Sequence, residues 1–168
     1  VSDCTPYSEL EKLKIEKEVV GFYISGHPLD QFRYEMKHFV RNRLSELEDM
    51  DPLVGQDMVF AGIVTEGVHR VSKNGKPFGV LSVEDYEHSH SFYLFSDDYL
   101  KFKEFMEVGW FLFITGSVVK NAWGQQRVEF KIRNIQLLSD VREKNSKTLH
   151  LKLMPEIVDE TMIETIAG

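Results

Sequence analysis

The chain has 168 residues, 42% of them hydrophobic, and a formal net charge of -7, so one main domain with appendages is expected. No apolar stretch approaches the roughly 20 residues that cross a bilayer, and the first residues lack the pattern of a signal peptide, so we expect a soluble, cytoplasmic chain. The single cysteine, Cys4, has no disulfide partner and no neighbouring metal ligands, which argues against a thiol function.

Residues 1–57 are predicted to be a helical segment followed by a linker. Apolar residues recur among Glu and Lys over residues 8–23, which predicts an amphipathic helix with Ser8 as its N-cap. Gly26 and Pro28 are expected to end this helix. A second short helix is predicted over residues 30–40, and the acidic stretch 41–57 indicates a connector.

Residues 58–138 have the texture of a small all-β domain. Short runs of Val, Ile, Phe and Tyr between turn residues predict five strands, at about 58–71, 77–84, 91–95, 110–119 and 126–137. The Asn74-Gly75 pair predicts a hairpin between the first two strands. A helix behind a capping aspartate is predicted over residues 97–108. Three strands, a helix and two strands is the order of the OB-fold, a five-stranded, partly open Greek-key barrel that often binds oligonucleotides.

The last segment, residues 139–168, is predicted to be the start of a further α+β domain, with a short strand at 148–153 and a helix beginning near 158. The expected fold is therefore mainly β: an OB barrel flanked by an N-terminal helical segment and a short, truncated tail.

The distribution of charge is more informative than its sum. Residues 1–57 contain 7 Lys/Arg and 12 Asp/Glu, residues 58–138 contain 9 and 9, and residues 139–168 contain 4 and 6. Within the barrel, the stretches 70–76 and 120–133 have a single acid, Glu129, against seven basic residues. These are Arg70, Lys73, Lys76, Lys120, Arg127, Lys131 and Arg133. Both stretches fall on loops with which OB-folds bind nucleic acid.

Strand alternation selects the aromatic residues that face outward. If Leu81 and Val83 point into the core, Phe78 points out, and inward Phe92 leaves Tyr93 outside. Together with Trp123 in the loop before the last strand, Phe78 and Tyr93 are candidate platforms for base stacking, and the basic residues are candidate phosphate contacts. For Trp123 and the basic strand residues, loop anchoring and a solvated strand face remain alternatives.

Three other motifs have simpler structural explanations. The sequence Gly26-His27-Pro28 fits a helix terminator, His88-Ser89-His90 fits a solvated turn better than a metal site, and Asp97-Asp98 fits a helix start. We expect no catalytic residues, no metal and no cofactor in this chain.

The sequence LKIEKEVVGFYISGHPLD at residues 13–30 resembles a segment of the alpha subunits of bacterial DNA polymerase III. The stretch VFAGIVTEGVHRVSKNGKPFGVLSVED at residues 59–85 is similar to the opening hairpin of the OB domain in that family. The resemblance implies a DNA-directed DNA polymerase whose catalytic carboxylates lie far upstream, with a helix-hairpin-helix region before the barrel and a domain that contacts the clamp-loader tau subunit after it.

The expected function is therefore a sequence-tolerant contact with single-stranded DNA during DNA replication. The expected partners are single-stranded DNA, other polymerase domains and, through the truncated last domain, tau. Two alternatives remain open at this point. One is an interaction barrel that holds polymerase domains or tau without binding DNA, and the other is an anticodon-binding barrel of an aminoacyl-tRNA synthetase.

Overall fold

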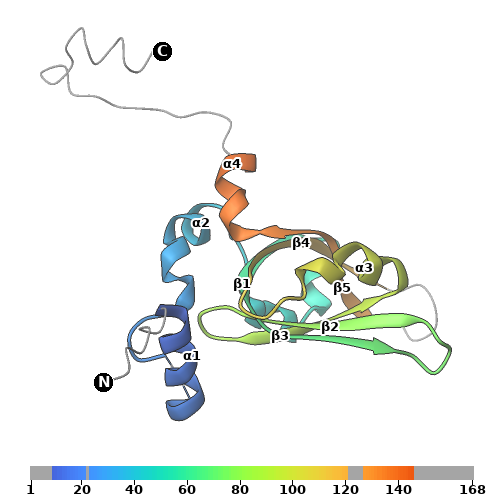
Figure 1. Cartoon of the computed structure of the whole chain (residues 1–168). Helices are drawn as coiled ribbons and strands as arrows, with labels where there is room; N and C mark the ends of the chain where they lie inside the picture. Colours follow the sequence, from blue (N-terminus) through green and yellow to red (C-terminus); the bar gives the residue numbers. More distant parts are fainter. Residues whose placement is uncertain (1–8, 22, 121–126, 146–168) are drawn as a thin grey trace, which may run out of the picture.

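The computed structural model describes residues 9–21, 23–120 and 127–145 (Figure 1). Its strands form one antiparallel sheet in the order β3-β2-β1-β4-β5, and α3 (Ser96–Phe102) lies between β3 and β4 in the chain. The strands are β1 (Asp57–Val71), β2 (Pro77–Glu84), β3 (Ser89–Phe95), β4 (Phe111–Lys120) and β5 (Val128–Leu137). The predicted mainly β fold, with a helix between the third and fourth strands, is confirmed.

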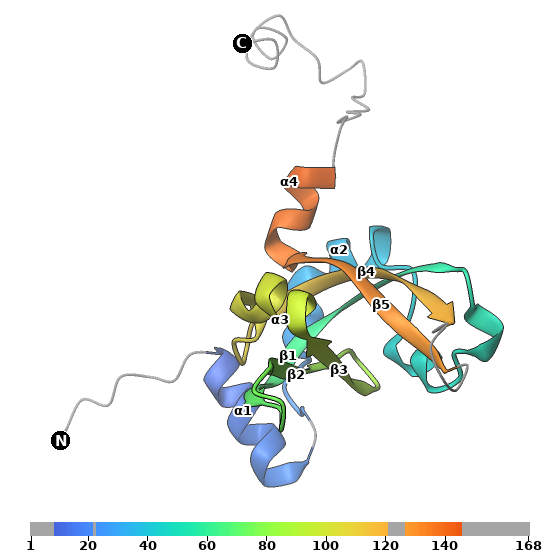
Figure 2. The same ribbon diagram turned by 90° about the vertical axis from the view of Figure 1, so that its right-hand side faces the viewer.

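The long strand β1 belongs to both halves of the sheet. Its first half pairs with β4 from Asp57 to Ile63, and its second half pairs with β2 from Ile63 to Val71. A register shift interrupts the second ladder between Val64 and Glu66, where such an irregularity increases the local twist. The sheet therefore curls round, and β5 faces β3 across the open side of the barrel (Figure 2).

The barrel core contains alternate residues of all five strands. Phe60, Leu81 and Leu112 are completely buried, as the period of two in a half-buried strand requires. Phe102 of α3 and Met106, which follows the 3-10 turn η4 (Lys103–Phe105), are also buried in this core. The helix thus closes one end of the barrel.

The start of α3 differs from the prediction. The residue that precedes the helix is Phe95, and it makes no side-chain cap hydrogen bond. Asp97 and Asp98 lie in the first turn instead, where negative charge interacts favourably with the helix dipole. The capping role assigned to the aspartates is therefore wrong, although the acids do mark the helix start.

The β1–β2 turn follows the prediction. The Gly75 N–H donates to the Ser72 carbonyl at 2.9 Å, and Gly75 has a φ of 74°, in the left-handed region that favours glycine. The Asn74-Gly75 pair predicts a hairpin because its glycine can adopt this left-handed conformation.

The N-terminal helix α1 (Glu9–Val20) ends earlier than predicted. Gly21 has a φ of 89° and its N–H donates to the Lys17 carbonyl at 2.9 Å, so Gly21 and not Gly26 terminates the helix. Val19 is 77% exposed and Val20 44%, so the apolar residues of the last turn do not face the barrel. Ser8, the expected N-cap, lies outside the described residues.

Residues 28–56 were expected to form a short helix over 30–40 and a connector over 41–57, but both stretches contain helical segments. They form η1 (Pro28–Phe32), α2 (Arg33–His38), η2 (Leu44–Glu48) and η3 (Asp51–Leu53). Leu44 and Leu47 are buried in the barrel core, and the Leu44 N–H donates to the Asp85 carboxylate at 2.8 Å. The connector interpretation missed these contacts because two leucines in an acidic stretch show no clear period. The domain division at residue 57 remains a prediction.

A second, smaller core joins the segment before the barrel to the segment that follows it. Leu29, which is completely buried, packs in one cluster with Ala61, Phe113, Leu138 and Val141. Leu138 begins η5 (Leu138–Asp140) and Val141 begins α4 (Val141–Asn145), which Figure 1 draws close to α2. The strand and helix expected beyond residue 145 lie outside the described residues. Among the described helices, none is long and apolar enough to cross a membrane.

These contacts predict that Leu29→Ala and Leu44→Ala each lower the free energy of unfolding by about 2–5 kcal/mol, because each removes a fully packed side chain and leaves a cavity. Urea unfolding of the 168-residue chain measures the effect. The matched control is Val19→Ala, at an exposed position, with an expected change within about 0.5 kcal/mol. Equal midpoints for Leu44→Ala and the control would show that residues 41–57 are only a linker.

Candidate nucleic-acid interface

Three aromatic side chains form a row on the outer face of β2 and β3. The Phe78 and Phe95 rings are 5.7 Å apart at 24°, and the Phe95 and Tyr93 rings are 6.4 Å apart at 11°. Tyr93 is 63% exposed and Phe95 59%, while Phe78 is half-buried. The structure thus places the predicted outward residues Phe78 and Tyr93 on one face, and nearly parallel rings present flat surfaces on which bases stack.

Phe95 completes this aromatic row, and it was not selected from the sequence. The sequence does indicate that Phe95 faces outward, because Phe95 lies two residues after Tyr93 in the same strand and must share its face. Its position next to the start of α3 concealed it, since the end of a strand is where alternation is hardest to extend.

A groove of about 580 Å³ runs between β3 and β5 beside the aromatic row. Tyr93 and Phe95 line its β3 side, and Lys131 and Phe130 line its β5 side. At its base, the Phe130 ring lies 5.9 Å from Phe92 and 5.2 Å from Phe60. Asp98 and Glu129 also line the groove, so its lining is aromatic and mixed in charge.

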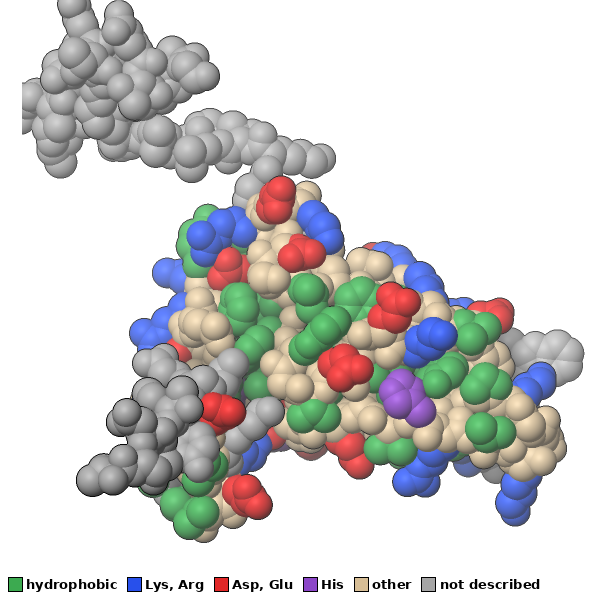
Figure 3. All heavy atoms as spheres, in the orientation of Figure 1, with side chains coloured by type: hydrophobic (Ala, Val, Ile, Leu, Met, Phe, Trp, Pro, Cys, Tyr) green, Lys and Arg blue, Asp and Glu red, His purple; other side chains and the backbone are tan. Residues whose placement is uncertain are grey.

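The other predicted basic residues lie near the end of β1, in the β1–β2 turn, at the end of β4 and just before β5. Arg70 pairs in register with Phe78, and Lys73 and Lys76 are exposed in the β1–β2 turn. Lys120 at the end of β4 and Arg127 just before β5 are exposed as well. Figure 3 shows Lys and Arg side chains at the right-hand end of the molecule, on the side where Figure 1 draws the β1–β2 turn. Trp123 lies outside the described residues.

Arg133 differs from the other basic residues because it has an acidic partner. Its guanidinium donates to the Asp57 carboxylate at 2.6 Å. The hydrogen bond and charge of Arg133 lower the pKa of Asp57, and those of Asp57 raise the pKa of Arg133. Both side chains therefore stay charged at neutral pH, and the positive charge of Arg133 is largely compensated.

The opposite end of the same strand face is polar and acidic. The Ser82 and Ser91 hydroxyls are 2.9 Å apart, and Ser82 donates to the Glu66 carboxylate at 3.4 Å. This arrangement does not favour phosphate there. The candidate interface is therefore limited to the aromatic row, the β3–β5 groove and the basic residues near the β1–β2 turn.

His88 lies in the β2–β3 turn, whereas His90 lies in β3 and lines the β3–β5 groove. His88 is exposed, whereas His90 is half-buried with its ring 4.8 Å from Phe92, and burial lowers the pKa of His90. The predicted solvated turn is therefore correct for His88 but wrong for His90, because strand β3 begins at Ser89. Among the described residues, no group of three or more His, Cys, Asp or Glu side chains could hold a metal ion.

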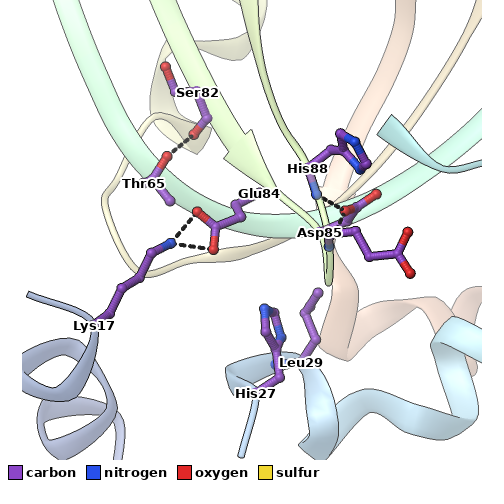
Figure 4. Close-up of polar contacts among 9 residues, drawn as sticks. Lys17, His27, Leu29, Thr65, Ser82, Glu84, Asp85 and His88 are labelled. Carbon is purple, nitrogen blue, oxygen red and sulfur yellow. Dashed lines mark hydrogen bonds and ion pairs between the residues drawn. The ribbon is translucent and has the colours of Figure 1, made fainter. Parts of the chain in front are cut away.

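The segment Gly26-His27-Pro28-Leu29-Asp30 includes the start of η1, and Figure 4 shows its residues His27 and Leu29. The His27 Nδ1 accepts a hydrogen bond from the Leu29 N–H at 3.1 Å, and the Asp30 carboxylate accepts one from the His27 N–H at 3.0 Å. This reciprocal capping box fixes the start of η1 and directs Leu29 into the second core. The ion pair between Lys17 and Glu84 connects α1 to β2 nearby.

The element order, the β1 strand shared between two halves of the sheet and the groove between β3 and β5 define an OB-type barrel.

Comparison with known proteins identifies its relatives. The chain is 25% identical over 166 residues to the DNA polymerase III alpha subunit of Escherichia coli (strain K12), and 28% identical over 161 residues to that of Aquifex aeolicus. These matches cover 98% and 95% of this chain, but only 14% and 13% of the two relatives. The resemblance to DNA polymerase III alpha subunits is thus confirmed, and the chain spans a small part of their length.

The chain was also compared with family models and with solved structures. No family model matches the chain. Among solved structures, an OBody bound to hen egg-white lysozyme aligns with 59% of this chain and 94% of its own at 20% identity and a TM-score of 0.43. The mitochondrial single-stranded DNA binding protein Rim1 of S. cerevisiae aligns with 51% of this chain and 94% of its own at 14% identity and a TM-score of 0.34.

The capping box predicts a pH-dependent stability. Burial lowers the pKa of His27 below its usual value of 6.5, so the unfolded chain binds a proton at a higher pH than the folded one. The contribution of His27 is therefore complete above pH 6.5 and is lost as the pH falls below that value. His27→Asn keeps a side chain that caps well but does not titrate.

Urea unfolding at neutral pH and at about pH 5.5 should show a smaller loss of stability for His27→Asn than for the natural chain. His90 titrates in the same direction in both proteins and cancels from the comparison. Identical dependence of stability on pH in the two proteins would show that His27 does not cause the loss of stability at low pH.

Proposed function

We propose that this chain is a single-stranded DNA contact module of a replicative DNA polymerase, and that the polymerase active site lies in another part of the full-length protein. The proposal rests on the aromatic row, because three exposed or half-buried rings in near-parallel stacks beside a groove have no role in the barrel core. The similarity to DNA polymerase III alpha subunits supports the replicative context.

The chemistry of the surface favours a contact that tolerates any sequence. Every base has a flat face that stacks on an aromatic ring, and each stacked base contributes about 1–3 kcal/mol. Lysine and arginine side chains near the rings neutralise phosphates without reading base edges. With about 3–5 phosphate contacts, log affinity should fall against log salt with a slope of roughly -2 to -3.5. Binding at physiological salt should therefore be modest.

The first test separates stacking from charge. Tyr93→Ala should weaken binding of an oligodeoxythymidine by about 1–3 kcal/mol with little change in the salt slope. Lys131→Ala should weaken all sequences equally and reduce the slope by about 0.7. Fluorescence anisotropy over a salt series measures both quantities.

The controls are Trp110→Ala, an exposed aromatic residue outside the row and the groove, and Lys12→Ala, an exposed cation on α1. Neither should change affinity by more than the experimental error. If the groove variants match these controls, or if no oligonucleotide binds even at low salt, the barrel serves as an interaction module between polymerase domains.

The Asp57–Arg133 ion pair gives a test in the opposite direction. Asp57→Asn removes the carboxylate that compensates Arg133, so DNA binding should become tighter and the salt slope steeper by about 0.7. Because both side chains are exposed, the barrel should remain folded. The matched control is Asp140→Asn, which breaks an exposed ion pair with Lys144 away from the groove. Unchanged DNA binding by Asp57→Asn would exclude Arg133 from the interface.

A further inference from the structure

A second pocket, of about 460 Å³, lies between α2, the loop that follows it, β1 and the β2–β3 turn. We call it the α2 pocket, and it shares no lining residue with the β3–β5 groove. Four of its lining residues are basic and two are acidic, in a chain with a net charge of -7. The basic residues are Arg33, Lys37, Arg41 and Arg43, and the acidic residues are Asp85 and Glu87. Figure 3 shows Lys and Arg side chains on the side where Figure 1 draws α2.

Both acidic side chains of the α2 pocket already have partners within the protein. Asp85 is 7% exposed, and its carboxylate accepts the N–H groups of Leu44, Glu87 and His88 at 2.8–2.9 Å. Glu87 pairs with Arg43 at 3.2 Å. The remaining positive charge therefore lies on the other side of the pocket.

That charge is carried by Lys37 and Arg41. Arg33 pairs with Asp30 at 3.3 Å, whereas the side chains of Lys37 and Arg41 have no ion-pair partner among residues 9–21, 23–120 and 127–145. The backbone that carries Arg41 is anchored, because the Arg41 and Asn42 N–H groups donate to the Val59 carbonyl at 3.4 and 3.1 Å. Within the part of the chain that the structure describes, two cations without an ion-pair partner thus lie beside one concave surface.

Apart from Asn42, the rest of the α2 pocket is apolar and aromatic. Met36, Val40 and Ala61 line it, and so does Tyr86, which is 43% exposed. The combination suits a ligand with an anionic end and a flat apolar end. The volume lies within the range of about 300–1,000 Å³ typical of small-molecule sites, which is larger than one acidic peptide side chain needs.

We propose that the α2 pocket binds a nucleotide unit, with its phosphate at Lys37 and Arg41 and its base against Tyr86 and the apolar lining. The guanidinium of Arg41 matches a phosphate through two parallel hydrogen bonds, and Lys37 adds a point charge. Such a unit belongs either to a DNA strand or to a free nucleotide, and both present the same chemistry to the pocket. This site is independent of the aromatic row and does not rest on the proposed function.

The test uses the full 168-residue chain with two probes, an oligodeoxythymidine and free dTMP. The variant combines Lys37→Ala and Arg41→Ala, and the matched control combines Lys12→Ala and Lys103→Ala, which removes two exposed cations elsewhere. We expect several-fold weaker binding for the pocket variant than for the control, and a salt slope lower by up to about 1.4 for the oligonucleotide. Amide resonances of residues 33–43 should shift in the natural chain when the probe is added.

The outcomes separate the sources and the two sites. Weaker binding of dTMP identifies a free nucleotide as sufficient, and an effect on the oligonucleotide alone identifies a nucleotide within a strand. Tyr93→Ala serves as the groove variant. If Tyr93→Ala alone weakens oligonucleotide binding, the α2 pocket inference fails while the proposed function stands. If the variant with Lys37→Ala and Arg41→Ala alone weakens binding, the α2 pocket inference stands and the aromatic row is not a DNA contact. Equal affinities and slopes for the pocket variant and its control, with no shifts at residues 33–43, overturn the inference.

Discussion

The contact between Phe92 and Phe130 bridges the open side of this barrel. β3 and β5 are the two edges of the sheet, and across the open side between them ring contacts take the place of a hydrogen-bonded ladder. The two edges are not hydrogen-bonded to each other, and a groove remains between them. The rings at its base hold the walls in place, and Tyr93, Phe95 and Lys131 are presented from those walls. The proposed DNA interface is thus a consequence of how the core closes.

The segment before the barrel supports the same architecture from outside. Leu44 and Leu47 fill the barrel core, and the buried Asp85 carboxylate connects the start of η2 to the β2–β3 turn. A buried carboxylate is stabilised only when hydrogen-bond donors surround it, and here three backbone N–H groups do so. The basic side of the α2 pocket can therefore lie next to an acidic turn without being neutralised by it.

The strands could be predicted from the sequence because β-strands of a half-buried sheet repeat every two residues and turn residues separate them. The predicted and observed bounds of β2 are identical, and Phe78 and Tyr93 point outward as alternation requires. The contacts of residues 41–57 and the pairing of Arg133 with Asp57 could not be predicted. Those contacts join residues far apart in the chain, and no local period records them. DNA binding by the selected residues could not be predicted either, because it depends on contacts with a second molecule.

The position of β1 has a consequence for how the chain acquires its structure during synthesis. β1 and β2 are neighbours in the chain and can pair as soon as their hairpin has emerged from the ribosome, whereas Met58 pairs with Gly116 only after the whole of β2, β3 and α3 has been made. Contacts between residues so distant in sequence form slowly, because a long loop must close first. Until then, the edge of β1 that later binds β4 is unpaired and open to other strands, so the nascent chain is most vulnerable to aggregation in the interval before β4 arrives.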